Sequence, residues 1–257
     1  MSWQYPGYQQ QMYRPNTNSN NLFVLDMKQA DVTGDGILDN VYLYGNKPDG
    51  QSGLFADHIT LVIQDGYSKN RTTVNLPNNA GYNSRLFLGD FDKDTIADIL
   101  VTIDSGGSGG YISSYIYSFR NKVLRKLFDV EQFNSHFKFN VNYEDYYKVS
   151  VGSPQLDVLF TLDISNKGYD YLSQYYNEDG KLKTPTKGEV LALGALYPIV
   201  TDEKSMSYDL LALQRIIGTF NADTLGYVEN LLTWGGTHFI SSRLSVSIPA
   251  SKLIALY

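Results

Sequence analysis

Two nine-residue segments of the sequence concentrate aspartates at spacings that suit a metal ion. We call them loop one, Asp31–Asp39, and loop two, Asp90–Asp98; together they hold seven of the 27 acidic residues. Neighbouring carboxylates repel one another, so this crowding is unfavourable unless a cation or a water shell offsets the charge. A hard divalent cation is the natural explanation of the pattern.

The spacing within each loop favours calcium. Calcium takes about six to eight oxygen ligands, and a tight loop supplies them from side chains at positions 1, 3 and 5, a carbonyl at position 7 and a carboxylate at position 9. The sequence therefore predicts two Ca²⁺ sites, and loop two, with one more charge, is expected to bind more tightly. The predicted ligands of loop one are Asp31, Thr33, Asp35, the Ile37 carbonyl and Asp39, and those of loop two are Asp90, Asp92, Asp94, the Ile96 carbonyl and Asp98.

Each loop departs from the ideal pattern at one position. Thr33 is a neutral ligand in loop one, and Thr95 stands in loop two where glycine is preferred. An EF-hand begins in the same way but needs a glutamate at position 12 and a following helix. Position 12 is Tyr42 in one segment and Val101 in the other, each within a run of β type. The alternative that remains is a pair of polar aspartate turns between strands.

The segments that must position these loops have the pattern of β-strands. Runs rich in β-branched and aromatic residues alternate with turn clusters from Asn21 onward. A single helix is predicted at Tyr169–Tyr176, and no Pro-, Gly- or Ser-rich linker divides the body of the chain. The predicted strands are Leu22–Met27, Asn40–Tyr44, His58–Gln64, Thr72–Leu76, Ile99–Ile103, Tyr111–Phe119, Lys138–Tyr143, Tyr147–Val151, Val158–Ile164, Leu210–Ile217, Tyr227–Trp234 and His238–Ile248.

An internal repeat relates the two loops. An offset of 59 residues lays Lys28–Tyr44 over Phe87–Ile103 and superimposes their aspartates. A further 111 residues on, Thr201–Asp209, which we call loop three, resembles a degenerate third copy. It has Lys204 and Met206 in place of ligands, so no metal is predicted there. A period of this length divides the chain into about four units, each with room for about four strands, which predicts an all-β, propeller-like fold of about four blades.

Length and composition bound the remaining possibilities. The 257 residues predict a single domain over residues 21–257, preceded by a flexible Tyr-, Gln- and Asn-rich arm over residues 1–20. A net charge of −6 disfavours nucleic acid and anionic membranes as partners. The absence of cysteine excludes disulfides and thiolate chemistry. No secretory signal is expected, because residues 1–20 lack an apolar run, and no segment has the roughly 18 apolar residues of a membrane span.

Other segments that resemble sites carry weaker signals. Asp104–Gly110 is glycine-dense but lacks the Gly-Lys-Ser/Thr ending of a phosphate-binding loop, so it is interpreted as a connection between strands. The three histidines, His58, His136 and His238, are far apart in the sequence, and none stands beside another metal ligand at helical spacing. No Gly-x-Ser-x-Gly motif is present to indicate a serine nucleophile.

The loops, with the hydrophobic strand that follows each, resemble the FG-GAP or VCBS-type repeats of integrin-like β-propellers. With Gly81–Asn83, Asp104–Gly110 and Asn221–Tyr227 the chain is similar to VCBS-repeat proteins of Bacillus-type bacteria. The resemblance implies a propeller-like β fold whose loops bind calcium and stabilise each blade. It implies no catalytic chemistry.

The expected function is a non-enzymatic calcium-binding scaffold with a structural or protein-interaction role. Weak calcium sites are filled only where calcium is abundant. The expected location of the protein is therefore the bacterial cytoplasm or the surface of a spore, which a protein can reach without secretion. A metal-dependent hydrolase that uses the aspartate loops as a catalytic centre is the alternative function, although the sequence shows no evident base. An adhesive role that binds another protein is compatible with the scaffold.

Overall fold

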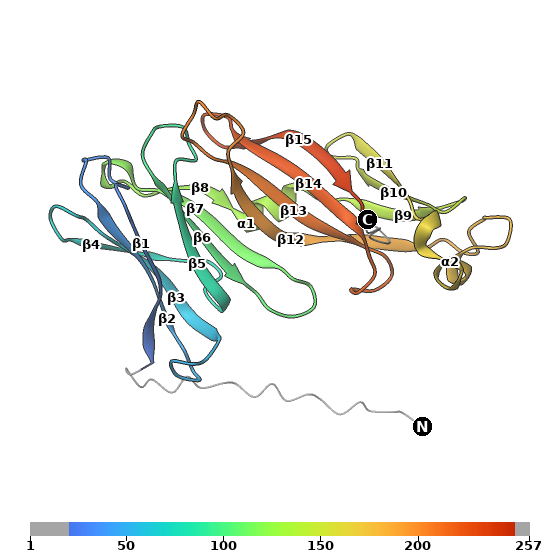
Figure 1. Cartoon of the computed structure of the whole chain (residues 1–257), viewed down its shortest axis with the longest axis horizontal. Helices are drawn as coiled ribbons and strands as arrows, with labels where there is room; N and C mark the ends of the chain where they lie inside the picture. The colour runs from blue at the N-terminus through green and yellow to red at the C-terminus, as the bar shows by residue number, and fades with distance from the viewer. Residues whose placement is uncertain (1–20, 250–257) are drawn as a thin grey trace, which may run out of the picture.

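The computed structural model describes residues 21–249 as strands joined by short loops, with few helical turns (Figure 1). The predicted arm of residues 1–20 lies outside the described residues. The helical elements are η1 (Arg120–Lys122), α1 (Val130–His136), η2 (Ser165–Lys167) and α2 (Tyr169–Tyr175). The strands are β1 (Leu22–Ala30), β2 (Asp39–Asn46), β3 (Phe55–Gln64), β4 (Arg71–Asn75), β5 (Gly81–Gly89), β6 (Asp98–Asp104), β7 (Ile112–Ser118), β8 (Arg125–Asp129), β9 (Asn140–Glu144), β10 (Lys148–Ser153), β11 (Val158–Asp163), β12 (Lys187–Ile199), β13 (Asp209–Ile217), β14 (Thr224–Trp234) and β15 (Phe239–Ser247).

The predicted all-β class is confirmed, and each predicted strand has an observed counterpart. The predicted helix is also present, as α2. The sequence pattern misses β5, β8, β12 and the helix α1. The longest of these, β12, contains Gly188, Gly194 and Pro198, which are residue types that strands disfavour, and pairing with β9 and β13 overrides that preference.

The strands form two sheets that are antiparallel throughout. The first has the order β1-β2-β3-β5-β6-β7-β8, with β4 paired to β3, and the second has the order β11-β10-β9-β12-β13-β14-β15. The first sheet curls until β1 lies beside β5, where Leu86 N donates to Asp26 Oδ2 at 2.8 Å. Figure 1 shows β1–β4 at one end of an elongated molecule and β9–β11 toward the other.

This arrangement is not the predicted ring of about four blades. In a propeller each unit of roughly four strands forms a sheet of its own. Here successive units join edge to edge, since β3 pairs with β5 and β9 pairs with β12. Edge-to-edge pairing satisfies backbone groups that separate blades would leave at their edges. The 59-residue period therefore marks repeated hairpins within continuous sheets.

One apolar core joins the two sheets. Strand β2 alternates as a half-buried strand should, with Val41 and Leu43 inside. Strand β6, by contrast, is buried on both faces from Asp98 to Ile103. Leu193 and Leu210 of the second sheet belong to the same core as β6, which explains why its sequence is a continuous apolar run. A second cluster lies among β9–β11, β13–β15 and α2.

Polar contacts also join the sheets at three places. Leu193 N in β12 donates to Asn134 Oδ1 in α1 at 2.9 Å. The glycine-dense segment connects β6 to β7, as predicted, and its Ser108 carbonyl accepts from Arg215 Nη2 at 2.9 Å. The third contact joins loop two to loop three. Within residues 21–249 no helix is long and apolar enough to cross a membrane.

Candidate metal centre

Three hairpins share one construction, in which a loop joins two paired strands and a buried aspartate begins the second strand. The predicted similarity of loop three to the other two is therefore present in three dimensions, although its closing pair encloses one more residue than the pairs that close loops one and two. The register pairs that close the loops are Ala30 with Asp39, Gly89 with Asp98 and Ile199 with Asp209, and the three aspartates are 0%, 1% and 5% exposed.

Loops one and two follow the same backbone path. The residues at positions 4 and 6 have positive φ in both: Gly34 (80°) and Gly36 (82°) in loop one, and Lys93 (62°) and Thr95 (71°) in loop two. Glycine adopts this region without steric cost, whereas residues with a Cβ are strained there. Thr95 therefore adopts the same turn conformation as Gly36, although glycine is preferred at this position. Loop two holds the geometry of loop one at a conformational cost.

Aspartates of both loops accept hydrogen bonds from backbone amides of their own loop. At position 9 one carboxylate oxygen accepts from the amides of positions 2 and 3, and at position 5 one oxygen accepts from the amide of position 7. Such bonds fix the carboxylates before any ion binds. The donors to Asp39 Oδ2 are Val32 N (2.9 Å) and Thr33 N (3.1 Å), those to Asp98 Oδ2 are Phe91 N (2.9 Å) and Asp92 N (3.2 Å), and Ile37 N (2.9 Å) and Ile96 N (3.0 Å) donate to Asp35 Oδ1 and Asp94 Oδ1.

Loop two gathers three of its predicted ligands. One carboxylate oxygen from each of Asp90, Asp92 and Asp98 lies within 4.8 Å of the others. The Asp92 side chain is only 4% exposed, and its Oδ1 atom is buried without a hydrogen-bond partner among the described residues. An unsatisfied buried carboxylate oxygen is costly. Three convergent carboxylates with an open acceptor form the start of a hard-cation site.

The electrostatics of loop two show the same crowding. Burial raises the pKa of Asp98 to about 7, and the neighbouring carboxylates of Asp92 and Asp94 add to the shift against two backbone hydrogen bonds that oppose it. Burial, followed by repulsion from Asp94, also raises the pKa of Asp92, although Arg125 acts in the opposite direction. The loop therefore favours protons, or another cation, on its carboxylates near neutral pH.

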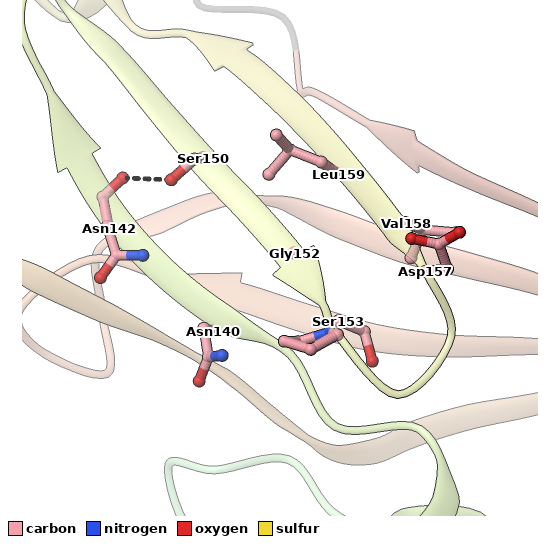
Figure 2. A pocket seen from close by; sticks show the side chains of 9 residues that line it. Asn140, Asn142, Ser150, Gly152, Ser153, Asp157, Val158 and Leu159 are labelled. Carbon is pink, nitrogen blue, oxygen red and sulfur yellow. Dashed lines mark hydrogen bonds between the residues drawn. The ribbon is translucent and has the colours of Figure 1, made fainter.

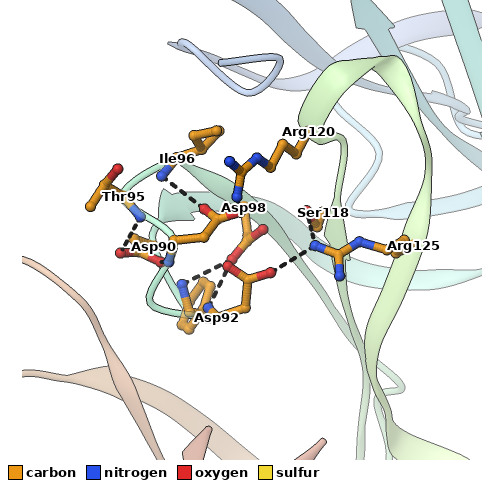
Figure 3. Close-up of polar contacts among 10 residues, drawn as sticks. Asp90, Asp92, Thr95, Ile96, Asp98, Ser118, Arg120 and Arg125 are labelled. Carbon is orange, nitrogen blue, oxygen red and sulfur yellow. Dashed lines mark hydrogen bonds and ion pairs between the residues drawn. The ribbon is translucent and has the colours of Figure 1, made fainter. Parts of the chain in front are cut away.

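Two arginines that the sequence analysis missed contact loop two, as Figure 3 shows. Arg125 Nη2 lies 2.9 Å from Asp92 Oδ2, and Arg120 Nη1 lies 3.1 Å from Asp94 Oδ2. Asp94 therefore lies outside the cluster of three, since its two oxygens bond Arg120 and Ile96 N. The signal that would have found these arginines is the basic segment Arg120–Lys126, in which four of seven residues are basic.

Loop one differs in that both oxygens of its buried Asp39 carboxylate accept hydrogen bonds. Asp39 Oδ1 accepts from Gly66 N at 2.7 Å, a bond with no counterpart on Asp98 within residues 21–249. At position 1 the loops are alike: both oxygens of Asp31 accept from backbone amides, of Gly34 (2.6 Å) and Gly36 (2.8 Å), as those of Asp90 accept from Asp94 N (3.1 Å) and Thr95 N (3.0 Å). No three acidic groups of loop one come as close together as those of loop two in the described part of the chain. Thr33, at position 3, is buried.

Loop three obtains its positive charge from the protein itself. Lys93 Nζ of loop two lies 3.6 Å from Asp209 Oδ1, and Thr201 Oγ1 donates to Asp209 Oδ2. Asp209 is the residue equivalent to Asp39 and Asp98. A lysine from a neighbouring loop thus stands where the other loops would use an ion.

Two grooves lie away from the acidic loops. The first, of about 330 Å³, lies on β9–β11 and is lined by polar side chains that include Asn140, Asn142 and Ser150 (Figure 2). The second, of about 510 Å³, lies beside α1 between aromatic side chains. His136 and His238, far apart in the sequence, both line the second groove. Neither groove contains a residue of loop one or loop two.

Comparison with known proteins identifies relatives of the chain. Residues 137–247, which hold all the strands of the second sheet, match the family described as the YybI C-terminal domain. The chain is 44% identical over 225 residues to the uncharacterized protein YybI of Bacillus subtilis (strain 168), an alignment that covers 88% of this chain and 85% of that protein. No solved structure matches the chain.

These matches overturn the resemblance drawn from the aspartate loops. The prediction that the chain is an FG-GAP or VCBS-type repeat protein is wrong, because the family that matches is a different one and covers the second sheet, outside loops one and two. The short motif misled because aspartates at alternate positions of a turn can arise in any family whose hairpins need that turn. Any role of the loops in metal binding must therefore be argued from their geometry.

Proposed function

The chain belongs to the YybI family, and we propose that it is a non-enzymatic, calcium-binding β-sheet scaffold. Loop two holds the principal ion in this proposal, and loop one is a weaker second site. The ion would act by linkage, since a ligand that binds only the folded protein stabilises it without taking part in a reaction.

The observation that carries the proposal is the unbalanced charge of loop two. Four carboxylates face two guanidinium groups, so two negative charges remain when all the acids are ionised. One Ca²⁺ ion carries two positive charges and would neutralise them. Asp92 belongs to the same cluster, and its buried Oδ1 has no hydrogen-bond partner among residues 21–249, so it offers an open acceptor. Oxygen donors alone suit calcium rather than a softer metal.

Loop one is proposed as the weaker site for two reasons. Both oxygens of its buried Asp39 are occupied by backbone amides, and its third position is the neutral Thr33. The carbonyls of Ile37 and Ile96 remain the proposed ligands at position 7. Loops of this kind bind calcium with dissociation constants from about 10⁻³ to 10⁻⁵ M, and loop one belongs at the weak end of that range.

The position of loop two supports a structural role over the alternative of a metal-dependent hydrolase. A catalytic metal keeps open positions beside a substrate pocket and needs a base nearby. Asp98 is 1% exposed, and the two grooves described above contain no residue of either loop. A loop that closes on its ion between two packed sheets stabilises structure.

A site with a dissociation constant of about 10⁻³ to 10⁻⁵ M is filled only where calcium is plentiful. We therefore propose a place on the spore surface, where the scaffold would contact protein partners, in preference to the vegetative cytoplasm. Immunolabelling of sporulating cells tests this placement. Label confined to the cytosol of vegetative cells would contradict it.

Calcium binding itself is tested by calorimetric titration and thermal melts of the EDTA-stripped full chain, with magnesium as the selectivity control. A calcium-specific rise in melting temperature that is lost in Asp92→Asn supports the proposal. Asp35→Asn, at position 5 of loop one, is the control in the other loop and should leave most of the rise intact. The absence of calcium heat and of any melting shift in metal-free protein would refute the proposed function.

A further inference from the structure

We propose that an ion at loop two clasps the second sheet to the first by holding loop three in place. This inference rests on the proposed function and extends it, because it names the structural event that ion binding controls. Loop two belongs to the first sheet and loop three to the second, and they meet at one point of the junction between the sheets.

Asp90 links the ion site to loop three through its main chain. Its carboxylate belongs to the cluster of three acids, whereas its carbonyl accepts from Tyr208 N at 2.7 Å. Asp90 and Ser207 also form an isolated parallel bridge between the loops. An ion that holds the Asp90 side chain therefore also fixes the backbone to which loop three binds.

Aromatic packing reinforces the main-chain contact. The Tyr208 ring lies edge-on to Phe87, with centroids 5.0 Å apart, and 5.9 Å from the ring of Phe91, which is fully buried. Gly89 makes room for this ring, because a Cβ at that position would lie 2.7 Å from it. Gly89 and Phe91, on either side of Asp90, thus leave space for the Tyr208 ring and pack against it.

Charge joins the same two loops. Lys93, at position 4 of loop two, reaches Asp209 Oδ1 at 3.6 Å, and that oxygen is buried without a hydrogen bond among the described residues. Lys93 of loop two thus pairs with the aspartate that begins β13 in the second sheet. Disorder in loop two would leave Asp209 buried without its counter-charge, which is costly.

These contacts make the ion and the closed position of loop three mutually dependent. If loop three opens only when loop two loosens and releases its ion, calcium lowers the population of the open form by a factor of one plus the ratio of its concentration to its dissociation constant. At 100 times the dissociation constant this factor is about 100. The contacts of Ser108 with Arg215 and of Asn134 with Leu193 join the sheets elsewhere and contain no part of either loop.

Hydrogen exchange of the Tyr208 amide in the full chain tests the clasp. Exchange is compared by NMR in EDTA and in calcium at 100 times the dissociation constant, with the Lys183 amide as control. The Lys183 amide donates to Tyr175 O at 2.8 Å in the connection after α2, remote from both loops. Calcium is expected to slow exchange at Tyr208 by up to about 100-fold and to leave Lys183 unchanged.

A second measurement uses trypsin cleavage after Lys204, which is exposed in loop three. Calcium should slow this cleavage in the wild type but not in Tyr208→Leu, which lacks the ring that docks between Phe87 and Phe91 yet keeps every proposed ligand.

Calorimetry on the same samples separates the two proposals. Absence of calcium heat refutes the proposed function. Calcium heat with unchanged Tyr208 exchange, with equal slowing at Tyr208 and Lys183, or with cleavage still slowed in Tyr208→Leu overturns the clasp alone.

Discussion

Replacing Asp98 by asparagine is expected to stabilise the metal-free protein and to weaken its response to calcium. Asparagine keeps the oxygen that accepts from Phe91 N and Asp92 N, but removes a charge from a buried cluster of acids. The pKa of Asp98 lies at about 7 instead of its ordinary 3.8. At about 1.4 kcal/mol per unit, the ionised carboxylate costs at most about 4 kcal/mol above pH 7. A domain of this size melts roughly 2–4 °C higher for each kcal/mol gained.

The sign of the pH dependence follows from the same pKa. Because the folded pKa is above the unfolded one, the folded protein binds more protons between about pH 4 and pH 7. The stability of the metal-free wild type therefore falls as the pH rises through that window. Asp98→Asn removes this contribution, so its stability should change less with pH over the same range.

Calcium should narrow the difference in stability between the two proteins. At 100 times the dissociation constant the wild type gains about 2.7 kcal/mol by linkage, whereas the variant has lost a proposed charged ligand and gains less. Urea titrations at pH 5 and pH 8, each in EDTA and in calcium, measure all these differences on one pair of proteins. The largest advantage of Asp98→Asn is expected at pH 8 in EDTA.

Asp39→Asn is the matched control, because Asp39 occupies the same position in loop one. Asp39 accepts from three backbone amides on both oxygens, so the new amide group would face Gly66 N, a donor. The cost should be about 1–3 kcal/mol with and without calcium. If Asp98→Asn destabilised the metal-free protein at pH 8 as Asp39→Asn does, the reasoning from crowded charge would be refuted.

Three further substitutions test other parts of the structure. Arg125→Gln removes the partner of Asp92, so thermal melts should show a lower melting temperature in EDTA and a larger rise with calcium; a smaller rise would contradict this. Tyr171→Phe removes the hydroxyl that donates to buried Asp223 at 2.6 Å and should cost about 1–3 kcal/mol in a urea titration, whereas an unchanged midpoint would show that this bond contributes nothing. Gly218→Ala places a Cβ 2.0 Å from Asp223 Oδ2 and should cost about 3 kcal/mol or more; a circular dichroism melt like that of the wild type would disprove the clash.

The sequence by itself determined the features that depend on neighbouring residues. Alternation of apolar and polar residues located most strands, because side chains of a strand point to opposite faces in turn. The turns of loops one and two were predictable for a similar reason, since the aspartates at positions 1, 5 and 9 accept from amides within seven residues of themselves. The helix α1 was missed although its signal is local: Asp129 caps it by accepting from Glu131 N and Gln132 N.

Tertiary structure alone decided which edges join and which loop offers an open acceptor. Pairing of β3 with β5 and of β9 with β12 depends on backbone groups that are alike in every strand, so no residue pattern distinguishes continuous sheets from separate blades. Asp39 and Asp98 are equivalent in sequence, yet Gly66, 27 residues from Asp39, satisfies only the first. Arg125 reaches Asp92 across 33 residues, and Tyr208 reaches Asp90 across more than 100. Such contacts form only when the whole chain has folded, because they join residues whose separation along the chain carries no local signal.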